Sequence, residues 1–265
     1  NFKGKRTDKN IVSQLSKNNP YSLTEPNQRN ITNAISRLGK VKGAKFNMGE
    51  VKTINFEKKT VSTQYETISY DSLIIAAGTT NNFFGIKGLQ EQVYTLKSVG
   101  EAMRCRNEIL YRLEQACITK DPEKRRKLLS FTVIGGGPTG VEIAGAIGEM
   151  KRYVLHREYP DLNVDDLKVT IIEGTDRLLR TMSESASREA LEYLGHLMVD
   201  VKLQTTMQSY NDNIITLANG EQIYSEMVIW TAGVTGEPFT FEGGTPEMAK
   251  GNRFIVDEFN RVLGV

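Results

Sequence analysis

The sequence predicts an α/β fold in which a parallel sheet is covered by helices and carries β-hairpin and meander insertions. Three observations support this prediction. A strong amphipathic helix precedes Ser130, strands and helices alternate after it, and short apolar strands run into glycine-containing turns. The chain has 265 residues, which is room for about one or two globular domains.

Composition excludes several classes of protein. The net charge is +2, from 34 basic and 32 acidic side chains, which gives no support to a nucleic-acid-binding surface. No apolar run approaches the ~20 residues that span a bilayer, and we expect no signal peptide. If Cys105 and Cys117 share a helix, they lie about 18 Å apart, too far for a disulfide. His156 and His196 lack the spaced partners of a metal site, so a structural role is favoured and no metal is expected.

The N-terminal part of the chain gives weaker signals. The first forty-five residues are polar, and apolar spacing over Ile31–Leu38 predicts one short helix. Thr60–Gln64 and Thr67–Ser69 are predicted to be hairpin strands. Leu73–Ile75 is predicted to be a short buried strand that runs into Ala76-Ala77-Gly78.

The clearest helix is predicted over Ser98–Thr119. Its apolar stripe is expected to contain Val99, Ala102, Met103, Arg106, Leu110, Leu113 and Cys117. Asp121 and Pro122 then form an N-cap and first helical position. The basic run Lys124–Lys127 is interpreted as a solvated helical face in preference to a phosphate or nuclear-localisation patch, because no aromatic residues interleave with it.

The following segment alternates strongly between strand and helix, as in a parallel sheet. The predicted elements are strand Phe131–Ile134, helix Val141–Tyr153, strand Val169–Ile172, helix Glu184–Leu194, strand Val199–Leu203, a hairpin turning at Asn219-Gly220, and strand Met227–Trp230.

A pattern of hairpin, apolar strand and Ala-Gly occurs twice, with an offset of 155 residues. The shift aligns Ile74 with Ile229 and Gly78 with Gly233. Two explanations fit this repetition. The two segments are unrelated strands that happen to leave a sheet through similar turns, or they arose by internal duplication of a nucleotide-binding unit. Gly135 lies 98 residues before Gly233 (233 − 135 = 98), so duplication would place an equivalent glycine loop at about −20 (78 − 98). We therefore expect the chain to be a fragment of a longer protein.

A dinucleotide fingerprint lies between the Phe131 strand and the helix after it. It consists of Gly135, Gly136, Gly137, Pro138, Thr139 and Gly140. Its first, third and sixth positions are glycine, which permits a tight turn, close approach of a pyrophosphate, and close packing of helix on strand. The helix N-terminus then offers free N–H groups to the diphosphate.

Glu173 ends the next strand, where a carboxylate accepts hydrogen bonds from the adenosine ribose and repels a 2′-phosphate. It follows Gly135 by 38 residues rather than about 20, and a polar insertion over Arg152–Asp166 accounts for the difference. NAD(H) is therefore favoured over NADP(H). The nearby Arg177 is the one residue that argues against this preference. The alternative for Glu173 is an ordinary acid at the end of a strand.

Glu142, in the helix behind the loop, allows two interpretations. It is a carboxylate that favours the positive helix end, or an acid near the redox centre. Trp230 is interpreted as a core residue. The sequence shows no Ser-His-acid arrangement and no closely spaced cysteine pair.

These residues resemble the flavin-dependent pyridine nucleotide oxidoreductases and, within them, the type II NADH dehydrogenases. The resemblance extends over about Lys45 to Val265 and depends on Tyr70–Gly78, Asn81–Gly85, Gly135–Ala144 and Val228–Val234. It implies two Rossmann-like domains, one for FAD and one, inserted into it, for NADH. It also implies hydride transfer from NADH to the flavin, then two electrons to a membrane quinone without proton pumping.

The resemblance also implies roles for individual residues. Gly135–Gly140 and Glu173 would hold NADH, and Glu142 would be the catalytic acid near the flavin and the quinone channel. The residues Ala232, Gly233 and Val234 would line the nicotinamide, and Ala76, Ala77 and Gly78 would abut the flavin.

The sequence departs from the family in lacking its flavin-phosphate glycine loop, late Gly-Asp motif and C-terminal membrane anchor. The expected domains are a partial FAD-binding domain (1–100), an NADH-binding domain (101–240) and a return into the first (241–265). We expect the chain to be soluble, to bind NADH, to hold FAD poorly and to be inactive with quinone. The full-length protein would lie peripherally on the cytoplasmic face of the inner membrane, as a monomer or a homodimer.

Two alternatives to a quinone reductase remain. One is a flavin-dependent NADH oxidoreductase with ferredoxin, rubredoxin or oxygen as acceptor. The other is a non-catalytic NADH-binding sensor.

Overall fold

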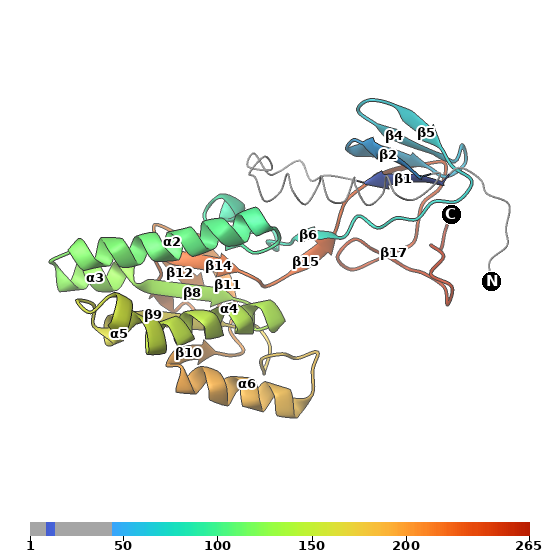
Figure 1. The fold of residues 1–265 in the computed structure, drawn as a ribbon. Helices are drawn as coiled ribbons and strands as arrows, with labels where there is room; N and C mark the ends of the chain where they lie inside the picture. Colours follow the sequence, from blue (N-terminus) through green and yellow to red (C-terminus); the bar gives the residue numbers. More distant parts are fainter. Residues whose placement is uncertain (1–8, 14–43) are drawn as a thin grey trace. The chain divides into compact units, whose positions relative to one another are not determined.

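The computed structural model describes residues 9–13 and 44–265, which contribute to two compact units (Figure 1). Unit 1 is drawn from Asn1–Thr80 and Val234–Val265, and unit 2 is Asn81–Gly233. The helix predicted over Ile31–Leu38 lies outside the described residues. The chain passes between the units at β6 (Thr79–Asn81) and β15 (Val234–Gly236), which pair with each other.

Unit 2 is built around a five-stranded parallel sheet. The order is β10 (Val199–Lys202), β9 (Lys168–Ile172), β8 (Ser130–Ile134), β14 (Met227–Trp230) and β7 (Tyr94–Thr95). The four strands predicted after Ser130 are confirmed, and β7 is an additional edge strand preceded by a short 3₁₀ turn, η1 (Leu89–Glu91). The α/β fold class is therefore confirmed.

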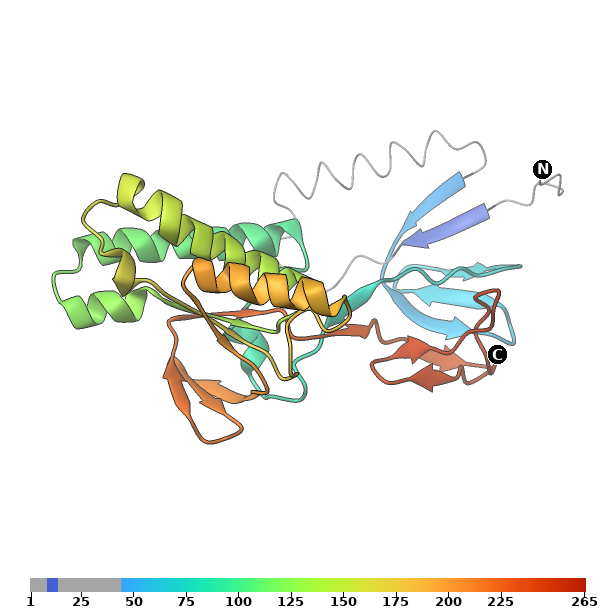
Figure 2. The ribbon, with the colours of Figure 1, turned by 90° about the horizontal axis from the view of Figure 1, so that it is seen from below.

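Both faces of this sheet are covered, but by different structures (Figure 2). One face packs against the helices α2 (Val99–Ile118), α4 (Pro138–Glu149) and α6 (Glu184–His196), and the other against an antiparallel meander of β11 (Met207–Asn211), β12 (Ile214–Leu217) and β13 (Gln222–Tyr224). Side chains alternate between the faces: Ile229 joins the core beneath the helices, and Val228 and Trp230 join the core beneath the meander. Trp230 is thus confirmed as a core residue.

Helix α2 has the predicted bounds, but its buried face is rotated relative to the predicted one. Ser98 forms a capping box with Glu101, which fixes the helix start. The buried side chains are Cys105, Ile109, Leu113 and Ala116. Of the predicted stripe, Leu113 is buried, and Leu110 and Cys117 are partly buried against the same core. The prediction is wrong for the other members, which are exposed: Val99, Ala102, Met103 and Arg106. The observed stripe is uninterrupted by charge and leaves Arg106 in water, whereas the predicted one placed its stem on the core.

The two cysteines lie on α2 and are both free, as predicted. Burial raises the pKa of the Cys105 thiol to about 11. The next helix, α3 (Pro122–Leu128), begins at Asp121, whose carboxylate accepts hydrogen bonds from the amides of Glu123 and Lys124. No residue of α3 is buried, which confirms the solvated face predicted for Lys124–Lys127.

The predicted insertion between α4 and β9 is mostly helical. Helix α4 starts three residues earlier than predicted and continues through a π-helical segment, η2 (Met150–Val154), into α5 (Leu155–Glu158). A 3₁₀ turn, η3 (Val164–Asp166), then leads into β9. Asp166 is only 6% exposed and accepts hydrogen bonds from the Nε atoms of Arg125 (3.0 Å) and Arg126 (3.2 Å). The insertion is therefore anchored on α3.

Unit 1 contains a second antiparallel meander. It consists of β3 (Val51–Asn55), β4 (Thr60–Thr63) and β5 (Thr67–Ser69), and β16 (Thr240–Glu242) joins β3 in parallel. Two small pairs complete the described strands: β1 (Lys9–Ser13) with β2 (Ala44–Met48), and β17 (Met248–Ala249) with β18 (Arg253–Phe254). The two predicted hairpin strands are confirmed as β4 and β5.

One strand prediction in unit 1 is wrong. Leu73–Ile75 forms no strand, and the Ile74 side chain is 88% exposed rather than buried. A strand requires neighbours for its backbone groups, and none of the described residues pairs with this segment.

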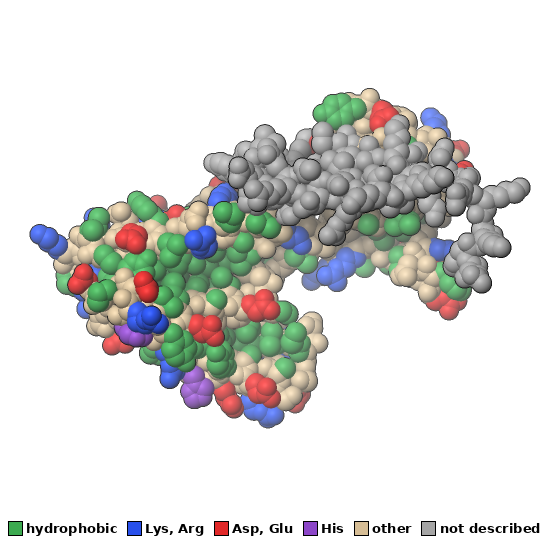
Figure 3. Space-filling view, viewed as in Figure 1, with side chains coloured by type: hydrophobic (Ala, Val, Ile, Leu, Met, Phe, Trp, Pro, Cys, Tyr) green, Lys and Arg blue, Asp and Glu red, His purple; other side chains and the backbone are tan. Residues whose placement is uncertain are grey.

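The visible surface of the molecule carries acidic and basic side chains interspersed with apolar ones (Figure 3). Within residues 9–13 and 44–265, no helix combines the length and apolar character needed to cross a bilayer. The same part of the chain contains no cluster of three side chains suited to a metal ion.

Candidate functional site

The carboxyl edge of the parallel sheet carries the glycine loop between β8 and α4. Gly135 has φ +110°, a conformation that L side chains rarely adopt, and its amide donates to the Ile172 carbonyl at 2.8 Å. A Cβ placed on it would lie 2.6 Å from the Ala232 Cα, and a Cβ on Gly140 would lie 1.8 Å from the Gly135 oxygen. Both positions therefore require glycine, as the fingerprint predicts.

The mouth of this loop is open. Gly137 is the N-cap of α4 and has no side chain to satisfy the first amides of the helix, and a Cβ placed on it would meet nothing within 4 Å. Pro138 occupies the first helical position, and both Pro138 and Thr139 are exposed. Unsatisfied amides at the positive end of a twelve-residue helix favour an anion such as a diphosphate.

Glu173 follows β9 and lies directly against the glycine loop. Its Oε2 accepts a hydrogen bond from the Gly136 amide at 2.6 Å, and its Oε1 accepts one from the Thr175 amide at 2.7 Å. A carboxylate oxygen has more than one acceptor position, so the carboxylate retains the capacity to bind ribose hydroxyls. The structure thus brings together the two features on which the NAD(H) prediction depends.

Arg177, the residue that argues against a preference for NAD(H), is directed into its own loop. Its Nη2 donates to the carbonyls of Arg180 (3.1 Å) and Met182 (3.4 Å). Its Nη1 is buried without a partner among the described residues. The loop also contacts the site through the Leu179 amide, which donates to the Gly136 carbonyl at 2.8 Å.

On the other side of the glycine loop lies the end of β14. The Thr231 hydroxyl donates to the carbonyls of Ile134 (2.9 Å) and Gly135 (3.1 Å), which ties this strand end to the loop. Sequence reasoning missed Thr231, because no signal near it in the sequence indicates that its hydroxyl reaches the glycine loop. Because β8 is flanked by β9 on one side and β14 on the other, the loop lies where the strand order reverses, the usual ligand crevice of such sheets.

The positions of the remaining candidate residues do not test their proposed roles. Glu142 is exposed on α4 beyond its first turn and makes no hydrogen bond or ion pair with the described residues. Ala76, Ala77 and Gly78 are exposed in unit 1, and Val234 is the first residue of β15 in the same unit. Their proposed roles remain predictions.

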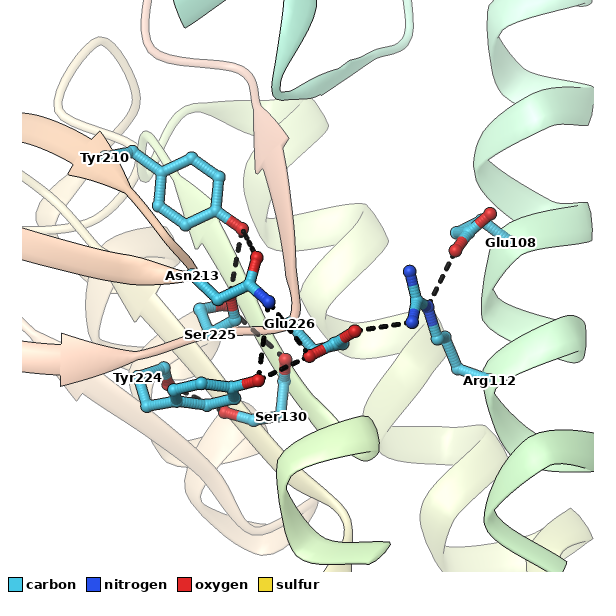
Figure 4. Close-up of polar contacts among 8 residues, drawn as sticks. All are labelled: Glu108, Arg112, Ser130, Tyr210, Asn213, Tyr224, Ser225 and Glu226. Carbon is cyan, nitrogen blue, oxygen red and sulfur yellow. Dashed lines mark hydrogen bonds and ion pairs between the residues drawn. The ribbon is translucent and has the colours of Figure 1, made fainter. Parts of the chain in front are cut away.

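The opposite, amino-terminal edge of the sheet carries a polar network (Figure 4). Glu226, just before β14, accepts hydrogen bonds from Arg112 of α2 (2.5 Å), Tyr224 (2.5 Å) and Asn213 (3.2 Å). Tyr210 donates to Asn213 at 3.2 Å, and burial together with the nearby Glu226 raises its pKa to about 12. This network joins α2 to the meander across the sheet.

Unit 2 therefore has a Rossmann-like fold. Its parallel sheet, its glycine loop and the acid at the end of β9 are features typical of dinucleotide-binding domains. The chain belongs to the pyridine nucleotide-disulphide oxidoreductase family, whose model matches residues 2–264.

Individual relatives agree with this membership. The chain is 28% identical to a probable NADH dehydrogenase of Dictyostelium discoideum, with 88% of this chain and 53% of that protein covered. It is 33% identical to the type II NADH:quinone oxidoreductase Ndh of Mycobacterium tuberculosis, with 75% of this chain and 42% of that protein covered. The chain thus spans about half the length of these relatives.

The fold is shared with NDH2 from Plasmodium falciparum in complex with NADH. That structure superposes with a TM-score of 0.69 at 24% identity, and covers 77% of this chain and 44% of that one.

Proposed function

We propose that the intact protein is an NADH:quinone oxidoreductase of the type II class and that this chain supplies its NADH-binding half. The observation that carries the proposal is the Glu173 carboxylate held 2.6 Å from the amide of Gly136, beside a helix start with unsatisfied amides. The names of the relatives support quinone as the acceptor, because they include NADH:quinone oxidoreductases.

The residues of unit 2 divide the work of binding NADH. The amides after Gly137 bind the diphosphate, and Glu173 accepts hydrogen bonds from the adenosine ribose while its charge disfavours a 2′-phosphate. The nicotinamide end then lies along Ala232 and Gly233 on the β14 side of the crevice. Glu142 is proposed as the catalytic acid, and Val234 as a further residue lining the nicotinamide.

FAD is proposed as the second cofactor, and it would supply two-electron transfer between NADH and the acceptor. Ala76, Ala77 and Gly78 are proposed to abut it, as part of an FAD-binding domain within residues 1–100 that resumes over 241–265. The described residues of unit 1 contain no loop comparable to Gly135–Gly140, so we derive no step through FAD.

The remaining assignments concern the whole protein. Residues 101–240 are proposed as the NADH-binding domain. Peripheral association with the cytoplasmic face of the inner membrane and a homodimeric state are proposed for the full-length protein.

Calorimetry with NADH and NADPH tests the coenzyme site. We expect Glu173→Ala to weaken NADH binding by ~1.5–3 kcal/mol, the scale of hydrogen bonds to a charged group, and to narrow the preference over NADPH. Glu173→Gln removes the charge but keeps an acceptor, so it should relax the preference with a smaller loss of affinity. Glu192→Ala, an exposed acid on α6, is the matched control.

An unchanged ratio of the two affinities in Glu173→Ala would remove Glu173 from the site. Absence of any heat when NADH is added to the folded wild-type chain would reject the proposed function itself.

A further inference from the structure

Phe84 adopts an unusual backbone conformation near the carboxyl edge of the parallel sheet in unit 2. Its φ is +50°, in the left-handed region that bulky side chains rarely occupy. An Asx turn holds it there, because its amide donates to the Asn82 Oδ1 at 2.9 Å. Asn82 is itself fixed to the end of β14: its amide donates to the Gly233 carbonyl at 3.0 Å, and its carbonyl accepts from the Trp230 Nε1 at 3.0 Å.

This anchored turn presents an aromatic ring to solvent. The Phe84 side chain is 60% exposed, although its ring centroid lies 6.1 Å from that of Trp230. The ring lies directly over Gly233, since a Cβ placed on Gly233 would be 2.7 Å from the Phe84 Cζ. A strained conformation that exposes an apolar ring gains little for folding, and such strain is typical of functional sites.

The position of the ring relative to the glycine loop gives it a role. Gly233 follows Ala232, whose Cα lies against Gly135. Glu173, proposed above to bind the adenosine ribose, lies on the β9 side of that loop. A dinucleotide that spans the crevice must then extend its other half toward β14, where the Phe84 ring stands.

We propose that Phe84 is a binding residue of the nicotinamide subsite, with its ring as the apolar wall against which the planar nicotinamide packs. The inference depends on the proposed binding of NADH and adds to it a residue that positions the reactive ring. A flat aromatic side chain suits this task because offset or edge-on packing of two rings restricts tilt without requiring a hydrogen bond. Because Gly233 has no Cβ, there is space for the Phe84 ring at the end of β14.

Phe84→Gly separates binding from folding. Glycine relieves the positive φ at this position, so the variant should keep a Tm no lower than the wild type. If the ring served only to cover Trp230, the same variant would lose stability and binding would not change. Phe84→Tyr keeps the ring and should retain wild-type affinity. Tyr111→Ala removes an exposed aromatic from α2 and is the matched control.

The test compares two ligands by calorimetry on the 265-residue chain. NADH carries the nicotinamide, whereas ADP-ribose presents the adenosine, diphosphate and second ribose without it. We expect Phe84→Gly to weaken NADH binding by about threefold to tenfold and to leave the affinity for ADP-ribose unchanged. If the affinity for NADH were unchanged, or if the affinities for NADH and ADP-ribose fell equally, the inference would be overturned and the proposed function would remain intact. If the wild-type chain bound neither ligand, the proposed function and the inference would both be overturned.

Discussion

Two regions of the chain follow one local pattern and reach different structures. In each, a three-stranded antiparallel meander precedes an apolar segment and an Ala-Gly pair. In the second region the apolar segment is β14, with Ile229 0% exposed. In the first, Leu73–Ile75 forms no strand, and the equivalent Ile74 is 88% exposed.

The difference shows that a strand is made by its neighbours. Hydrogen bonds join β14 to β8 on one edge and β7 on the other, and both of its faces are covered. No described residue pairs with Leu73–Ile75. The sequence can therefore identify an apolar segment with strand character, but the backbone partners that make it a strand come from elsewhere in the chain.

The largest expected effect contrasts the two equivalent isoleucines. Ile229→Ala should destabilise unit 2 by about 2–5 kcal/mol, because it leaves a cavity beneath the helices. Ile74→Ala should change stability by less than about 0.5 kcal/mol, because the side chain is in water. Urea unfolding followed by Trp230 fluorescence reports on unit 2, and far-UV circular dichroism reports on the whole chain. Similar costs at the two positions would remove the contrast.

The fold of unit 2 was predictable because its signals are local. Apolar runs such as Phe131–Ile134, the cap at Ser98 and the turn at Asn219-Gly220 each encode an element within a few residues. The buried face of α2 was not predictable in this way, because apolar side chains occur at two rotational positions and the sheet selects one. The same limit applies to Leu73–Ile75, whose burial depends on distant strands.

The candidate site shows the same division. The glycine loop and Glu173 were predictable because their spacing and position after strands specify their chemistry. Thr231 and Phe84 were not, since each acquires its significance from a neighbour about 97 or 149 residues away (231 − 134 = 97; 233 − 84 = 149).

A smaller effect is expected at the acids that precede the two apolar segments. The 155-residue offset aligns Glu226 with Asp71 (226 − 155 = 71). Glu226→Ala should cost about 3 kcal/mol, because Arg112 and Tyr224 lose a partly buried partner. Asp71 is exposed and has no partner among the described residues, so Asp71→Ala should be neutral. The same urea titration measures both, and a neutral Glu226→Ala would show that the network adds nothing to unit 2.

The smallest effect concerns the buried tyrosine of the second meander. The Tyr210 hydroxyl donates to the Ser225 carbonyl at 2.9 Å. Burial, and then the charges of Glu226 and Tyr224, raise its pKa from 10.0 to about 12. The unfolded chain therefore releases this proton at lower pH than the folded chain. The stabilisation is complete below pH 10 and is lost as pH rises from about 10 to about 12.

Tyr210→Phe isolates this contribution. At pH 8 the variant should be less stable by about 1 kcal/mol, because the Ser225 carbonyl loses its donor. The gap should narrow as pH rises from about 10 to about 12, since only the wild type loses the contribution of a protonated Tyr210 in that range. Tyr65→Phe, at an exposed tyrosine of unit 1, should match the wild type throughout. A gap that stays constant with pH would mean that Tyr210 titrates alike in the folded and unfolded chains.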